Sequence, residues 1–160
     1  MMGDNFSNIS GNVRIATRGS KIGGEELQKS KQERLVFISY GLEDQENVFE
    51  LYEWLRLKSI SSWLDCQNLR GGDDWDSVIE KTIRNSASAI ICFSAKTRFK
   101  QGYFKKEQEL ILKISDLIPE RFKVFPVTLD NTEIPKEFSI FQVSNFLSML
   151  SMTKLELALF

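Results

Sequence analysis

Residues 60–94, ISSWLDCQNLRGGDDWDSVIEKTIRNSASAIICFS, contain the pattern that decides the fold. They begin with a short strand candidate, ISSWLD (60–65), and pass through a loop with two adjacent glycines. DSVIEKTIRNS (76–86) follows, with apolar residues at helical spacing. The stretch ends in SAIICFS (88–94), a nearly unbroken apolar run of the kind found in strands that are covered on both faces. It therefore predicts a strand, a helix and a second strand.

The same alternation continues on both sides of this stretch. It predicts a strand at 34–40 (RLVFISY) and a helix at 43–59 upstream, and downstream a helix at 102–114, a strand at 122–129, a weak strand near 141–143 and a last helix at about 150–160. This order predicts an α/β fold, a flavodoxin-like three-layer sandwich with a central, mainly parallel five-stranded sheet and right-handed crossovers. Pro126 argues against a central position for the strand at 122–129, because proline has no N–H for the ladder.

The composition limits the classes of function. Lys and Arg total 21 and Asp and Glu total 22, so the charge balance does not predict direct binding to nucleic acid. No apolar run approaches the ~20 residues that cross a bilayer. The N-terminal sequence MMGDNFSNIS lacks the basic and apolar regions of a signal peptide. We therefore expect a cytoplasmic protein that does not bind membranes.

The chain divides at about residue 33. Residues 1–33 are rich in Gly, Ser and Asn, whereas 34–160 carry the strand and helix patterns of one domain. Two interpretations remain for the N-terminal segment. It is either a flexible tail or a small oligomerisation or docking element.

Histidine is absent, and Cys66 and Cys92 are the two cysteines. Imidazole acid–base catalysis and Ser-His-Asp or Cys-His nucleophiles are therefore excluded. Two isolated thiols do not make a typical four-ligand zinc site, so no metal is expected. Any chemistry must depend on carboxylates, hydroxyls or lysines.

The helix after the third strand carries an unusual carboxylate. At about 100° per residue, Tyr103, Leu110, Ile111 and Ile114 share one side, and Glu107 falls in the middle of it. Ligands of parallel sheets bind beyond the carboxyl ends of the strands. An inward acid near that edge is a candidate functional group, and the alternative is a partly exposed helical Glu in this position by chance.

Other polar groups have two interpretations each. Arg70 with Gly71 and Gly72 either approaches a phosphate or forms a simple turn, although no Walker A or GxGxxG pattern is present. Trp75 either packs on this loop or offers a flat face to a ring. Asp73 or Asp74 is expected to cap the following helix.

Several acidic residues lie near the predicted strand ends. The acids at positions 43, 44, 46 and 50 are expected to be solvated and to complement the dipole of the first helix. A receiver-type Mg²⁺ pocket would use acids at the ends of the first and second strands. Asp65 fits this pattern, but the first strand ends in Ser39 and Tyr40, which argues against such a pocket.

The chain resembles the TIR domain family in its bacterial branch. VFISYGLED is similar to the family's first strand, and W-x-D, then L-x-x-G-D-x-W, then I-x-x-x-I-x-x-S and a strand ending in Ser are similar to the region from the second to the third strand. The likeness spans residues 34 to about 145. In members that cleave NAD⁺, a catalytic glutamate follows an aromatic residue by four positions, as Glu107 follows Tyr103, with Tyr in place of the usual Trp.

The resemblance implies an NAD⁺ hydrolase or ADP-ribosyl cyclase, with NAD⁺ as substrate and no further cofactor. Glu107 is then the catalytic residue. The groups implied around the nicotinamide riboside half are Ser39, Tyr40, Asp65, Arg70, Trp75, Ser94 and Tyr103.

The resemblance also implies self-association. In the family, the loop corresponding to residues 66–75, called the BB loop, often completes the site of a neighbouring copy. Assembly would then control activity in an antiphage effector or signal producer that answers to a sensor or effector partner. The alternatives are a non-enzymatic TIR interaction module and a pathogen protein that imitates host TIR domains. Whether water or adenine attacks the ribose stays open.

Overall fold

The computed structural model describes residues 34–65, 71–72 and 74–160. Its centre is a five-stranded sheet in the order β2-β1-β3-β4-β5, and every pairing is parallel. The strands are β1 (Val36–Ser39), β2 (Ser62–Trp63), β3 (Ser88–Phe93), β4 (Lys123–Thr128) and β5 (Ser144–Asn145). The predicted α/β sandwich with a central parallel five-stranded sheet is confirmed.

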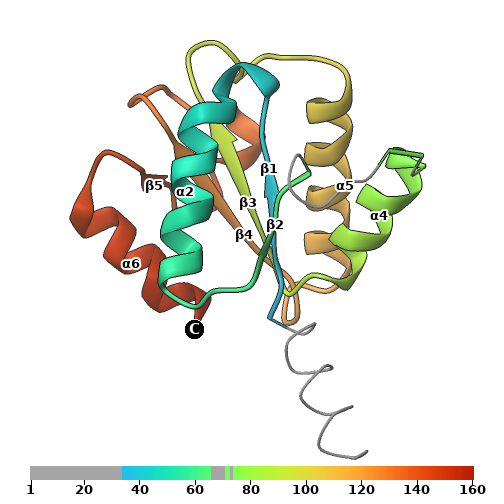
Figure 1. Ribbon diagram of the computed structural model, residues 1–160. Helices are drawn as coiled ribbons and strands as arrows, with labels where there is room; N and C mark the ends of the chain where they lie inside the picture. The colour runs from blue at the N-terminus through green and yellow to red at the C-terminus, as the bar shows by residue number, and fades with distance from the viewer. Residues whose placement is uncertain (1–33, 66–70, 73) are drawn as a thin grey trace, which may run out of the picture.

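Helices cover both faces of the sheet (Figure 1). They are η1 (Leu42–Asp44), α2 (Gln45–Leu57), α4 (Trp75–Asn85), α5 (Tyr103–Leu117), η2 (Lys136–Phe138) and α6 (Met149–Leu159). Helices α2 and α6 lie on one face, and α4 and α5 lie on the other (Figure 1). None of the helices in the described part of the chain is long and apolar enough to cross a membrane.

Two apolar cores separate these layers because successive strand residues point to opposite faces. Val36 and Ile38 of β1 belong to the core under α2 and α6. Phe37 belongs to the core under α4 and α5, where its ring stacks on Trp63 with 5.1 Å between centroids. Full burial of such side chains contributes about 1.5–3 kcal/mol each to stability. Ser39, two residues after Phe37, therefore points toward α4 and α5.

Pro126 lies in a strand that is not at the edge. β4 pairs with β3 along its whole length, with Pro126 opposite Ile91, and also pairs with β5. The expectation that proline would keep this strand from a central position was thus wrong. The two-residue strand β5 pairs only with Val127 and Thr128, so Pro126 lies beyond the short outer ladder.

Two local predictions need adjustment. The last strand lies at Ser144–Asn145 and not at 141–143. Asp74 is the N-cap residue of α4, as expected, but its side chain makes no capping hydrogen bond. Residues 1–33 lie outside the described residues, so both interpretations of that segment remain predictions.

Candidate active site

The end of β1 meets the start of α5 through one hydrogen bond. Ser39, the last residue of β1, donates its hydroxyl to Oε2 of Glu107 at 2.5 Å. Glu107 is the fifth residue of α5 and is partly buried. The inward orientation predicted for this carboxylate is therefore confirmed in the structure.

Burial controls the ionisation of Glu107. It raises the pKa of this carboxyl from 4.5 to about 8, against the hydrogen bond from Ser39, which lowers it. The negative charge of Asp65 raises the pKa further. At neutral pH the carboxyl is mainly protonated, and a cation placed beside it would favour the ionised form.

Glu107 lines a cavity of about 240 Å³ between α4 and α5. The cavity has an apolar wall from both helices and a charged rim. Its lining residues are Asp76, Ile79, Glu80, Ile83, Tyr103, Lys106, Glu107 and Leu110. Glu80 is already paired with Arg84 at 2.8 Å, which leaves Asp76, Glu107 and the ammonium of Lys106. The lining therefore favours a small cationic ligand once Glu107 is ionised.

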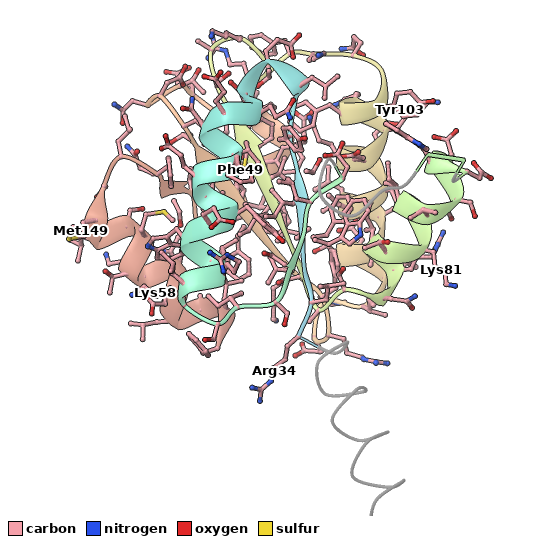
Figure 2. All side chains as sticks on the ribbon, in the orientation of Figure 1. Arg34, Phe49, Lys58, Lys81, Tyr103 and Met149 are labelled. Atoms are coloured by element: carbon pink, nitrogen blue, oxygen red, sulfur yellow. The ribbon has the colours of Figure 1, made fainter. Side chains whose placement is uncertain are left out.

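Aromatic residues stand at the first positions of both helices. Trp75 begins α4 with 54% of its surface exposed, and Tyr103 begins α5 with 60% exposed. Figure 2 shows Tyr103 beside the first turn of α5, on the side toward α4. The ammonium of Lys106 lies 5.2 Å from the centre of the Tyr103 ring. The ring of Tyr103 lines the cavity and is accessible to a ligand there, whereas Trp75 is exposed but is not among the lining residues.

The helical-wheel prediction was wrong for Tyr103, which does not face the core. Phe104 is the buried aromatic residue of this turn, and its ring lies 5.9 Å from that of Phe93. Tyr103 is the first residue of α5 and lines the cavity between α4 and α5 instead of the core. Ile111 and Ile114 are buried as predicted, and Leu110 is partly buried.

Tyr40 orients a second carboxyl group. It lies in the core under α2 and α6, and its hydroxyl donates to Oδ1 of Asp65 at 2.6 Å. Asp65 follows the end of β2 closely, and Glu107 binds Ser39 at the end of the parallel neighbour β1, so both acids lie at the same edge of the sheet. Ser39, the last residue of β1, and Tyr40, the next residue along the chain, thus each bind one of these acids.

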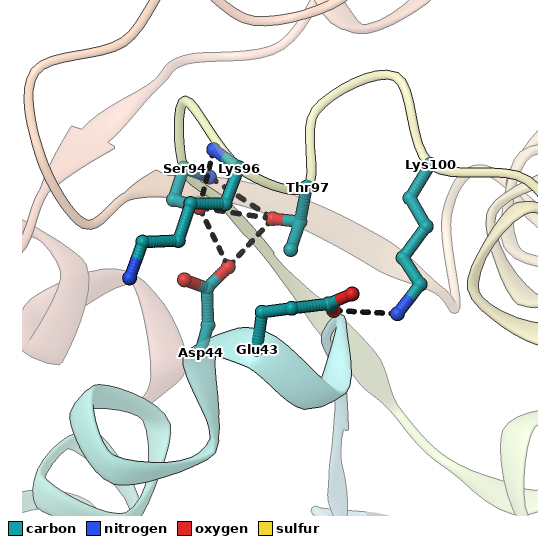
Figure 3. Close-up of polar contacts among 6 residues, drawn as sticks. All are labelled: Glu43, Asp44, Ser94, Lys96, Thr97 and Lys100. Atoms are coloured by element: carbon teal, nitrogen blue, oxygen red, sulfur yellow. Dashed lines mark hydrogen bonds and ion pairs between the residues drawn. The ribbon is translucent and has the colours of Figure 1, made fainter.

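Ser94 belongs to a different polar cluster, shown in Figure 3. Its hydroxyl donates to Oδ2 of Asp44 at 2.8 Å, and the hydroxyl of Thr97 donates to the same oxygen at 2.5 Å. Asp44 is 3% exposed, so the expectation of a solvated acid was wrong for this residue. Among the described residues, no hydrogen bond joins Ser94 to Glu107.

The Asp44 cluster ties the start of α2 to the loop before α5. Asp44 is enclosed because Ser94 and Thr97, which lie 50 and 53 residues further along the chain, bind its carboxylate. No local signal in the sequence identifies such an acid, since an acid in a first helical turn is ordinarily solvated. Arg70 lies outside the described residues, as does most of the 66–75 loop. Those predictions remain untested.

The structure is thus a three-layer α/β domain with the carboxyl group of Glu107 at the carboxyl ends of the parallel strands. Residues 36–156 match the family model described as TIR domain. The chain therefore belongs to the TIR domain family. No curated protein sequence matches the chain.

Solved structures agree with this fold. The TIR domain of the Toll-related receptor TRR-2 from Hydra magnipapillata is 19% identical with a TM-score of 0.65, covering 78% of this chain and 96% of that chain. The TIR domains of the activated Roq1 resistosome, which directly recognises the pathogen effector XopQ, are 25% identical with a TM-score of 0.54, covering 78% and 72%. A prokaryotic SEFIR domain is 21% identical with a TM-score of 0.56, covering 79% and 92%.

Proposed function

We propose that this TIR domain is an NAD⁺ hydrolase or ADP-ribosyl cyclase that cleaves the bond between nicotinamide and ribose. The observation that carries the proposal is the position of Glu107. Its carboxyl group is partly buried at the carboxyl edge of the sheet, receives the Ser39 hydroxyl and lines a cavity with an acidic rim. A carboxylate in such a place can act on a substrate that develops positive charge.

The reaction needs little proton transfer. The N-glycosidic bond breaks, its electron pair stays on the pyridinium nitrogen, and nicotinamide leaves as a neutral molecule. The ribose passes through an oxocarbenium-like transition state, as in glycoside hydrolysis, and the ionised Glu107 stabilises its positive charge. Water then attacks the anomeric carbon and releases a proton, giving ADP-ribose. Attack by an adenine nitrogen would give a cyclic isomer.

The surrounding residues have secondary roles in this proposal. The exposed ring of Tyr103 lines the cavity and can stack on the nicotinamide. The exposed ring of Trp75, at the start of α4, is proposed to contribute a second flat face. Asp76 on the cavity lining is proposed to attract the cationic ring, whereas Glu80 there is already paired with Arg84. Asp65 and Arg70 are proposed to contact the nicotinamide riboside half, as the resemblance to NAD-cleaving members implies.

We further propose a cytoplasmic immune role in the bacterial, antiphage branch, with activity switched on by assembly through residues 66–75. The TIR domains of Roq1, 25% identical to this chain, belong to an activated resistosome. That precedent supports an assembly-dependent activity. A sensor or effector partner would then bring copies together.

Purified protein incubated with NAD⁺, with and without a scaffold that concentrates it, tests the enzymatic proposal by chromatography of nicotinamide. Glu107→Gln should lower the rate by about 10²–10³-fold, the cost of removing one electrostatic group. Glu109→Gln is the matched control, because Glu109 is exposed on the same helix. Equal cleavage by wild type and Glu107→Gln would overturn the assignment of Glu107.

The alternative function is a non-enzymatic interaction module. Several large apolar side chains near α6 favour it because they are exposed. They are Leu147, Met149, Leu150, Leu157 and Phe160. A wild-type protein that assembles on the scaffold but releases no nicotinamide would support this alternative.

A further inference from the structure

We propose that Ser39 is a positioning residue that holds one oxygen of Glu107 and leaves the other for the ligand. The sequence resemblance placed Ser39 among the groups that contact NAD⁺. The positioning role of Ser39 rests on the proposed function of Glu107. It concerns the hydrogen bond between these two side chains and not a contact between Ser39 and NAD⁺.

Burial excludes Ser39 from direct contact with a ligand in this conformation. Its exposed fraction is 0%, whereas Glu107 lines the cavity between α4 and α5. The hydroxyl is directed at Oε2 of Glu107 at 2.5 Å. A group that touches the carboxylate but has no accessible surface acts on the substrate only through that carboxylate.

The backbone of Ser39 is held in place by the sheet. Its strand, β1, lies between β2 and β3, and Ser39 itself pairs with Ile91 of β3. Glu107, by contrast, has a long side chain with three rotatable bonds. Among the described residues, Ser39 supplies its one hydrogen bond. That bond selects a single orientation of the carboxylate before any ligand arrives.

The same bond opposes the effect of burial on ionisation. Burial raises the pKa of Glu107, and Ser39 lowers it by donating to the carboxylate. The other groups around Glu107 are Asp65 after β2, Asp76 and Glu80 from α4, and Tyr103 and Lys106 from α5 itself. Among these groups, the charge of Asp65 raises the pKa of Glu107, so the Ser39 hydroxyl supports the charge that catalysis needs.

Titration of Glu107 by carboxyl ¹³C NMR tests the link without any need for activity. In Ser39→Ala the pKa of Glu107 should lie above that of wild type, because the donor is lost. Ser39→Cys should behave like Ser39→Ala, since a thiol is a weak donor of similar size. Ser39→Thr keeps the hydroxyl and should restore the wild-type value. Ser88→Ala removes another buried serine, at the start of β3, and should change nothing.

Kinetics on NAD⁺ then test the consequence for catalysis. Ser39→Ala should lower kcat by about tenfold to a hundredfold, the range for a lost hydrogen bond to a charged group, and leave KM within about twofold. In Ser39→Ala the rise of the rate with pH should occur at higher pH than in wild type. Ser39→Thr should restore both kcat and the pH profile.

The outcomes separate the two proposals. If Glu107→Gln abolishes cleavage but Ser39→Ala matches Ser88→Ala, the positioning role is overturned and the enzymatic function stands. A raised KM with unchanged kcat would also overturn it, because Ser39 would then bind substrate. If no variant cleaves NAD⁺ yet the Glu107 titration depends on Ser39, the enzymatic function fails and the positioning of the carboxyl group is supported.

Discussion

The hydroxyl of Ser39 and the carboxyl group of Glu107 are joined by a 2.5 Å hydrogen bond across 68 residues of sequence. The bond connects the central part of the sheet to α5, at the cavity between α4 and α5. Because burial outweighs this hydrogen bond, the pKa of Glu107 rises to about 8. The same carboxyl group therefore makes the folded protein sensitive to pH.

Glu107→Gln should stabilise the protein above pH 5. The folded-state pKa of about 8 exceeds the ordinary value of 4.5, so the folded state holds a proton that the unfolded chain releases. Wild-type stability attributable to this group is complete below about pH 4.5 and declines as the pH rises toward 8. The variant has no such decline. We expect its advantage to reach about 4 kcal/mol at pH 8, at about 1.4 kcal/mol for each unit between the two pKa values.

Urea denaturation of both proteins from pH 5 to 9 measures this difference. Glu109→Gln, on the exposed side of α5, should follow wild type at every pH. A constant gap between wild type and Glu107→Gln across that range would contradict the raised pKa.

The rate of NAD⁺ cleavage should increase with pH. Only the ionised carboxylate stabilises an oxocarbenium ion, so kcat/KM should rise with pH and level off above about 8, the pKa of the free enzyme. In the bound complex the cationic pyridinium favours the carboxylate, so the limb in kcat should lie at lower pH. Steady-state rates between pH 5.5 and 9.5 give both profiles. A flat kcat/KM profile would show that the ionisation of Glu107 does not limit the reaction.

Gly41→Ala should destabilise the loop that follows β1. A Cβ at Gly41 would lie 2.5 Å from Cγ2 of Thr97 and 2.9 Å from its Cβ. Such overlap in a packed site costs about 1–3 kcal/mol. Thr97→Ser removes the closest atom and keeps the hydroxyl that binds Asp44, so the double variant should recover part of the loss. Thermal melts of the four proteins form a double-mutant cycle. Strict additivity would contradict the clash.

Asp44→Ala should lower the free energy of unfolding by about 2–3 kcal/mol, because the hydroxyls of Ser94 and Thr97 lose a buried acceptor. Asp44→Asn retains one carbonyl oxygen and should cost less. Glu46→Ala, an exposed acid in the first turn of α2, is the control and should change little. If Asp44→Ala and Glu46→Ala were equally stable, the buried cluster would make no net contribution.

Local patterns in the sequence predict the main elements of this fold. Unbroken apolar runs at 34–40, 88–94 and 122–129 became β1, β3 and β4, because burial on both faces requires apolar residues throughout. Helical periodicity placed Glu107 on the inner side of α5. The TIR motifs between 34 and 145 fall within the residues that match the family model, 36–156.

The sequence was less informative wherever a side chain depends on a distant segment. Asp44 is buried because the loop after β3 folds over it, and Ser94 binds that acid and not Glu107. Tyr103 is exposed because α5 begins at that residue, which a helical wheel does not locate.

The sequence by itself determined the order of strands and helices, the absence of imidazole chemistry and the inward carboxylate on α5. Those properties follow from composition and from periodicities of a few residues. Only the tertiary structure decided that Ser39 is the partner of Glu107 and that the two acids Glu107 and Asp65 share one edge. The strand order places β1 between β2 and β3. It therefore brings together side chains that are dozens of residues apart in the chain.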